Sequence, residues 1–257
     1  MDIFAVIGTI LGISMILIGM IMEGGNVAQI MQITAAFIVV GGTFGAVVLS
    51  FPIGTLVNAI KLLNAVYFMM PPKFEPLIAE IVDFSQKARK EGVVALEKLA
   101  KSASDPLLAT GLEAVADGAD PALVKSILEA QVNELEKHVA SGAKVWESAG
   151  GYAPTLGIIG AVMGLIQVMQ NLTDPSKLGA GIAVAFVATI YGLFVANLWT
   201  IPFSTRIKVK YAEIFKAKEI IIEGVMAIQA GESPAFIERK LSAYIIDEKP
   251  KAKGKEG

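Results

Sequence analysis

The strongest constraint in this sequence is that four long apolar stretches carry no charged side chain. They cover residues 3–22, 33–52, 149–170 and 178–203. A helix of about 20 apolar residues crosses the hydrocarbon core of a bilayer and satisfies its own backbone polar groups there. The alternative, four buried helices of a large soluble protein, is disfavoured because too little chain remains to cover them. We therefore expect an integral membrane protein with four transmembrane helices.

The basic residues predict how these spans are oriented. Of the 22 Lys and Arg residues, ten lie in segment 53–148 and eleven in segment 204–257, whereas the short loops 23–32 and 171–177 hold only Lys177. Basic residues concentrate on the cytoplasmic side of membrane proteins. The large loop, the tail and both termini are therefore expected in the cytoplasm. The formal net charge of −2 gives no indication of nucleic-acid binding.

The cytoplasmic segments have the pattern of helices. Three acceptor–proline pairs mark helix starts, with an N-cap side chain before a proline at the first helical position: Asp105-Pro106, Asp120-Pro121 and Ser233-Pro234. From Pro121 one helix is expected to run into the third span, and Arg206 to about Gln229 should continue the fourth. The final KPKAKGKEG, residues 249–257, is polar and expected to be disordered. No strand pattern competes, so the predicted fold class is all-α.

These patterns divide the chain into four parts, two in the membrane and two forming a helical cytoplasmic domain. The expected parts are spans one and two (1–52), the cytoplasmic loop (53–148), spans three and four (149–203) and the cytoplasmic tail (204–257).

The amino-acid composition gives little support for an enzyme. The chain has no cysteine and a single histidine, His138, which is more typical of a solvated or packed side chain than of a catalyst. No nucleotide-binding, nucleophile-elbow or zinc-protease motif occurs. We expect no catalytic residue, cofactor or metal. The spans also lack Asp, Glu, Lys, Arg and His, which intramembrane proton relays normally use. Any titrating group for ion transfer must therefore come from a partner.

Three kinds of residue in the spans are candidates for specific roles: small residues, prolines and threonines. Small residues four apart let helices approach closely, within one chain or between chains; they are Gly8/Gly12, Gly41/Gly45, Gly160/Gly164 and Ala188/Gly192/Ala196. Pro154 lies inside the third span and Pro202 near the end of the fourth, where each forms a fixed kink or a hinge. Thr155 and Thr189 either bond to their own backbone or line an ion path.

The arrangement of two spans, a loop of about a hundred residues, two further spans and a charged tail resembles the MotA/PomA family of flagellar stator proteins. The resemblance covers nearly the whole chain. The most specific stretches are APTLGIIGAVMGLI at 153–166, DPSKLG at 174–179, AVAFVATIYGLFVANLWTIPF at 183–203 and, in the loop, ARKEGVVALE at 88–97.

This resemblance implies a function. The family forms a pentameric ring around two copies of a MotB-type partner, whose membrane aspartate takes the ion, and ion passage rotates the ring. The cytoplasmic loops push on the rotor protein FliG. By position, Pro154 and Pro202 match the family's two functional prolines, Arg89 and Glu97 match its rotor-contacting charges, and Thr189 matches a hydroxyl of the ion path.

Two positions depart from the family pattern. Sodium-driven members tend to have threonine where this chain has Ala161, which favours protons as the coupling ion. Members often carry an aspartate three residues before the first proline, where this chain has Gly151, so no role of that acid is carried over.

Three other interpretations of the sequence compete with a flagellar stator protein. The related ExbB/TolQ energisers typically have three spans, which the fourth span and the long loop oppose. A transporter should show broken or polar helices in paired repeats, and Pro154 has no counterpart in a matching half. A purely structural scaffold is opposed only by the motif match.

Overall fold

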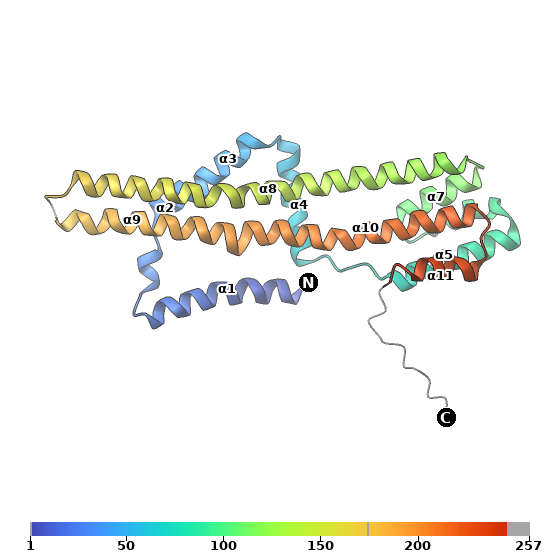
Figure 1. The fold of residues 1–257 in the computed structure, drawn as a ribbon, viewed down its shortest axis with the longest axis horizontal. Coiled ribbons are helices and arrows are strands. Elements are labelled where there is room, and N and C mark those ends of the chain that lie inside the picture. Colours follow the sequence, from blue (N-terminus) through green and yellow to red (C-terminus); the bar gives the residue numbers. More distant parts are fainter. Residues whose placement is uncertain (1, 174, 246–257) are drawn as a thin grey trace, which may run out of the picture. The chain divides into compact units, whose positions relative to one another are not determined.

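The computed structural model describes residues 2–173 and 175–245, so the C-terminal segment expected to be disordered lies outside the described residues. The described chain is helical and contains no strand, which confirms the all-α class. Its contacts divide it into two compact units (Figure 1). The first unit comprises residues 1–70 and 137–211, and the second comprises residues 71–136 and 212–257.

The helices of the first unit contain the four predicted spans. Four of its helices are long and apolar enough to cross a membrane. In chain order its elements are α1 (Ile3–Met22), η1 (Val27–Ile30), α2 (Ile33–Ala36), η2 (Phe37–Gly41), α3 (Gly42–Ser50), α4 (Ile53–Tyr67), the second part of α8 (Pro121–Gln170), α9 (Pro175–Phe194), η4 (Val195–Thr200) and the start of α10 (Ile201–Gln229).

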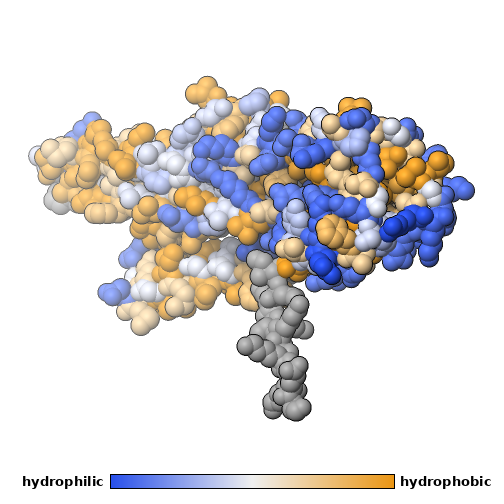
Figure 2. All heavy atoms as spheres, turned by 45° about the vertical axis from the view of Figure 1, so that its right-hand side comes forward, coloured by the Kyte–Doolittle hydropathy of each residue, from blue (hydrophilic) through white to orange (hydrophobic). Residues whose placement is uncertain are grey.

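The membrane helices bury few of their own side chains. Phe4 of α1 is 82% exposed and Leu49 of α3 is 90% exposed. Figure 2 shows hydrophobic residues over much of the surface of these helices. An isolated water-soluble protein rarely exposes so much contiguous apolar surface, whereas lipid or neighbouring subunits would cover it. The first unit therefore has the surface of a membrane protein.

The second unit has an ordinary hydrophobic core. It contains α5 (Phe74–Glu91), η3 (Val93–Ala95), α6 (Leu96–Ala100), α7 (Pro106–Ala116), α11 (Pro234–Ser242) and the remaining parts of α8 and α10. Ile81, Leu108, Leu128, Ile221 and Leu241 are fully buried in one cluster. Each comes from a different helix, so the loop and the tail fold together into one helical domain.

Local sequence signals explain where three helices of the second unit begin. The Asp105 carboxylate accepts from the Leu107 N–H at 2.8 Å, the Asp120 carboxylate accepts from the Ala122 N–H at 2.8 Å, and the Ser233 hydroxyl accepts from the Phe236 N–H at 3.3 Å. These are the three predicted caps, and a proline follows each at the first helical position.

Two π-helical turns interrupt the spans, and the sequence patterns did not predict them. One is η2 in the second span and the other is η4 in the fourth. By contrast, α8 runs through Gly150 and Gly151 without a break, which confirms the expected continuous helix from Pro121 into the third span. Likewise α10 continues the fourth span to Gln229.

Candidate functional site

The third and fourth spans are in backbone contact through glycines. In Figure 1, α8 and α9 lie side by side. A Cβ atom placed on Gly192 would lie 2.6 Å from the Ala153 carbonyl oxygen and 3.0 Å from Pro154 Cα. One on Gly164 would lie 2.7 Å from the Gly181 carbonyl oxygen. These distances are too short for any side chain, so the two backbones touch where Pro154 lies.

The glycine pairs of the first two spans behave differently. A Cβ atom on Gly8, Gly41 or Gly45 would meet no atom of the described chain within 4 Å, and one on Gly12 would meet only the Leu198 side chain, at 3.2 Å. Within a single chain, the pattern of small residues four apart therefore marks close packing in the third and fourth spans only. The space beside Gly8, Gly41 and Gly45 is therefore open to lipid or a neighbouring subunit.

The two prolines predicted as hinges lie in this helix pair. Pro154 is half-buried inside α8, opposite Gly192. Pro202 is exposed near the start of α10, two residues after the π-helical turn η4. Proline has no N–H to donate to the carbonyl four residues before it, so each helix loses one internal hydrogen bond at this point. Both helices are therefore weakened locally, in the same unit.

The candidate ion-path residues lie on the same two helices. Thr189 is half-buried, and its hydroxyl donates to the Ala185 carbonyl at 3.2 Å. Thr155 is exposed and donates to the Tyr152 carbonyl at 2.7 Å. Ala161 is half-buried one helical turn beyond Gly157. Both threonine hydroxyls thus donate to their own helix, as most intramembrane threonines do, while their oxygen atoms keep acceptor capacity.

Arg89 and Glu97 are both exposed in the second unit, but they do not share one helix. Gly92 has a φ of +88°, which ends α5 at Glu91, and the chain restarts as η3 and then α6. The break at Gly92 therefore separates the two residues. Arg89 lies in the last turn of α5 and Glu97 in the first turn of α6. The neighbouring Lys87 pairs with Asp83 at 2.6 Å, so it is engaged within its own helix.

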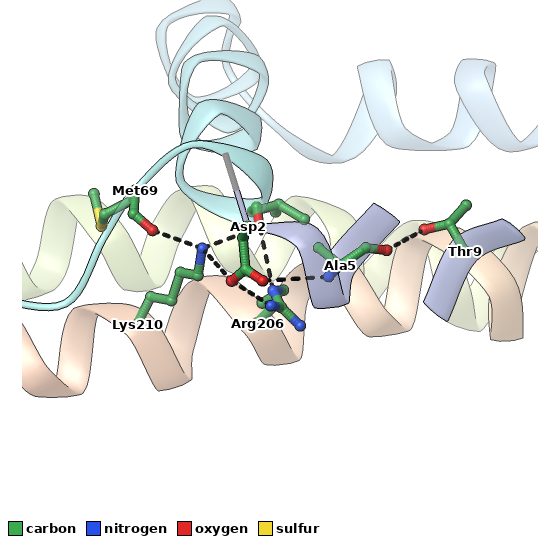
Figure 3. Close-up of polar contacts among 7 residues, drawn as sticks. Asp2, Ala5, Thr9, Met69, Arg206 and Lys210 are labelled. Carbon is green, nitrogen blue, oxygen red and sulfur yellow. Dashed lines mark hydrogen bonds and ion pairs between the residues drawn. The ribbon is translucent and has the colours of Figure 1, made fainter. Parts of the chain in front are cut away.

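A polar cluster at the start of α1 was missed by the sequence reasoning (Figure 3). The Asp2 carboxylate accepts from Arg206 and, at 3.0 Å, from Lys210, and it also caps the Ala5 N–H. Lys210 in turn donates to the Val66 carbonyl in the last turn of α4 and to the Met69 carbonyl just after this helix. The signal was present: an acid directly before a charge-free helix is an N-cap pattern.

The cluster joins α1, α4 and α10 through ion pairs and hydrogen bonds. Arg206 and then Lys210 hold the pKa of the Asp2 carboxyl well below its ordinary value, because both donate hydrogen bonds to its ionised form. Asp2 is therefore ionised at every physiological pH. The attachment of α1 to α10 at this point does not respond to pH in the physiological range.

A second ion pair joins α8 to α10 just outside the third span. Glu147 accepts from Lys144 at 2.8 Å and from Lys208 at 2.5 Å. These two hydrogen bonds lower the pKa of Glu147 to about 2. The side chains are substantially exposed, so the pair orients the helices more than it stabilises them.

His138 takes no part in a site. Its side chain is exposed, and only its backbone carbonyl is used, accepting from Asn58 at 2.7 Å. Among the described residues no group of three or more His, Cys, Asp or Glu side chains is placed to hold a metal ion.

Comparisons with known proteins agree with this architecture. Residues 99–220 match the model of the MotA/TolQ/ExbB proton channel family. Motility protein A of Helicobacter pylori (strain ATCC 700392 / 26695) is 34% identical over the full length of both chains. Motility protein A of Bacillus subtilis (strain 168) is 34% identical over 95% of this chain and 91% of its own. The solved structure of C. jejuni MotAB superposes with a TM-score of 0.91 at 28% identity, covering 99% of this chain and 100% of that one.

Proposed function

The chain belongs to the MotA/TolQ/ExbB proton channel family, on its motility protein A branch, and we propose that it is a stator subunit of the bacterial flagellar motor. The observation that carries this proposal is the full-length likeness to a MotAB structure. The ExbB/TolQ alternative fits less well, because the similar full-length relatives are motility proteins. The proposed role is mechanical rather than enzymatic.

We infer that ion transfer requires a MotB-type partner. The four spans contain no Asp, Glu, Lys, Arg or His, the residues that mark proton paths in membranes. A membrane aspartate of the partner would take the ion beside the third and fourth spans. Thr189, Thr155 and Ala161 lie on these spans and would contribute to the path. The alanine favours protons over sodium.

The proposed assembly is a pentameric ring in the inner membrane of a bacterium. Its support is the extensive exposed apolar surface of α1 and α3, part of which would face lipid and part a neighbouring subunit. The distribution of Lys and Arg supports a cytoplasmic position for both termini and the second unit. No nucleic acid is involved in this assembly.

Arg89 and Glu97 would transmit force to the rotor protein FliG. Both are exposed. They lie on the two sides of the turn at Gly92, Arg89 in α5 and Glu97 in α6, rather than on one straight helix. A turn of this kind presents two opposite charges close to the surface. Movement of the ring would carry this turn past the rotor, with Pro154 and Pro202 allowing the cytoplasmic unit to move relative to the spans.

Reversal of one of these charges provides the test. In a cell lacking its own stator, the wild-type chain with its MotB-type partner should restore swimming, whereas Arg89→Glu should swim poorly. Exposed ion pairs contribute only about 0–1 kcal/mol each. We therefore expect partial loss, with recovery when an acid on the rotor is changed to lysine. The measurement is swimming speed, with Lys125→Glu as the control, since Lys125 is an exposed cation elsewhere in the second unit.

Two results would count against parts of this account. If the wild-type chain with its partner never restores swimming, the stator function itself is wrong. If the wild type swims and no rotor reversal rescues an assembled Arg89→Glu stator, Arg89 does not act by charge on the rotor.

A further inference from the structure

The π-helical turn η4 ends at Thr200, two residues before Pro202 in the fourth span. The Ile201 N–H donates to the Ala196 carbonyl five residues back, rather than to the carbonyl four residues back as in an α-helix. Pro202 has no N–H to donate at all. The backbone between Val195 and Pro202 is thus held by fewer and longer-range bonds than an ordinary helix. π-Helical turns of this kind occur frequently at functional sites.

The Thr200 side chain adds a hydrogen bond to the backbone of this turn. Its hydroxyl lies 3.0 Å from the Val195 carbonyl oxygen and 3.3 Å from the Ala196 carbonyl oxygen. Thr189 and Thr205 on the same long helix bond only to the carbonyl four residues before them. Only 6% of Thr200 is exposed. The hydroxyl is therefore enclosed, and it holds the widened turn through two carbonyls that the π geometry separates.

The neighbouring helix leaves room for Thr200 by presenting a glycine. A Cβ atom on Gly150 of α8 would lie 3.0 Å from the Thr200 hydroxyl oxygen and 2.5 Å from Ile201 Cγ1. A Cβ atom on the adjacent Gly151 would meet no described atom within 4 Å. Pro154, one helical turn further along α8, faces Gly192 of the fourth span. Each weakened segment of one helix therefore lies against a glycine of the other.

We propose that Thr200 is a positioning residue, which fixes the π-helical turn two residues before Pro202 and so sets the direction in which the fourth span bends. This inference rests on the stator function proposed above. Without the hydroxyl, the turn can move along the helix or return to α-helical bonding. Each residue of such a shift changes side-chain direction by about 100°. The bend at Pro202 would then point away from the direction that productive rotation uses.

The test compares Thr200→Val, which keeps the shape and loses the hydroxyl, with Thr200→Ser, which keeps the hydroxyl. Motor speed is measured at low load, where conformational steps limit the rate, and torque is measured near stall. We expect Thr200→Val to lower the low-load speed roughly two- to ten-fold, the change that one net hydrogen bond makes to a rate. Stall torque and copurification with the partner should stay close to wild type, and Thr200→Ser should restore the speed.

A distance measurement gives a readout that does not depend on motility. The chain contains no cysteine, so spin labels attached to cysteines at Leu193 and Val209 report only the segment across η4. Both positions are exposed and belong to the first unit. In rings diluted with unlabelled chains, wild type and Thr200→Ser should give one narrow distance distribution, and Thr200→Val a broadened or shifted one. Thr205→Val is the matched control, because it removes an ordinary bond to the Ile201 carbonyl.

The outcomes separate this inference from the stator function. Wild-type distances and wild-type low-load speed in Thr200→Val would overturn the positioning role while leaving the stator function intact. An inactive wild type would remove the stator function, and the distance distributions would still decide the role of Thr200. Thr200→Ala is made in parallel. If neither hydroxyl-free variant assembles while Thr200→Ser does, the hydroxyl maintains the fold rather than the direction of bending, and the proposal is wrong.

Discussion

Replacement of Gly192 by valine should prevent the third and fourth spans from packing, and stators with this change should fail to assemble. A single Cβ atom there would already lie 2.6 Å from the Ala153 carbonyl oxygen and 3.0 Å from Pro154 Cα. Overpacking a core against side chains costs about 1–3 kcal/mol. Here the obstacle is backbone, which cannot change rotamer, so the cost should reach or exceed the upper end of that range. The helices would have to separate along their whole contact.

The measurement is the yield of detergent-solubilised complex with the partner, together with its thermal unfolding midpoint. Gly151→Val is the matched control, because its Cβ would meet no described atom within 4 Å. The control should keep most of the wild-type yield. Normal yield and stability of Gly192→Val would mean that the contact between the two backbones is not required for assembly.

Alanine at Pro202 should leave assembly intact and abolish swimming or slow it severely. The new N–H can donate to the Leu198 carbonyl, which restores α-helical bonding next to η4. An interior proline costs a helix roughly 3 kcal/mol relative to alanine, so the substitution stiffens the segment that the proposed mechanism bends. Pro154→Ala should act in the same way on α8.

Swimming speed and copurification with the partner are measured together for these variants. Pro121→Ala is the control, since this proline stands at the first position of α8, where its missing N–H has no helical partner to serve. Normal swimming by both Pro154→Ala and Pro202→Ala would reduce the two prolines to fixed kinks.

Much of this architecture follows from the sequence because its causes are local. Charge-free stretches fix the spans, and acceptor–proline pairs such as Asp105-Pro106 fix the helix starts. The break at Gly92 could not be predicted from residue type alone, because glycine permits a positive φ but does not require it. Exposure of Arg89 and Glu97 could likewise be expected from their charge.

The remaining features depend on contacts between distant residues. The sequence shows small residues four apart in all four spans, yet only the third and fourth spans use them within the chain, because helix pairing decides which faces meet. The Asp2 cluster joins residues 204 positions apart. The π-helical turns arise where packing and Pro202 compete with α-helical bonding, and no residue pattern announces them.

We propose that this chain guides an ion that binds to an aspartate carboxyl group of a partner protein. Proton flux into liposomes, followed with a pH-sensitive dye, tests it most directly. Three preparations are compared: this chain alone, the chain with its MotB-type partner, and the chain with a partner whose membrane aspartate is replaced by asparagine. We expect flux only in the second preparation, because the four spans contain no Asp, Glu, Lys, Arg or His. Substantial flux through this chain alone, or flux unchanged by loss of the partner's aspartate, would contradict it.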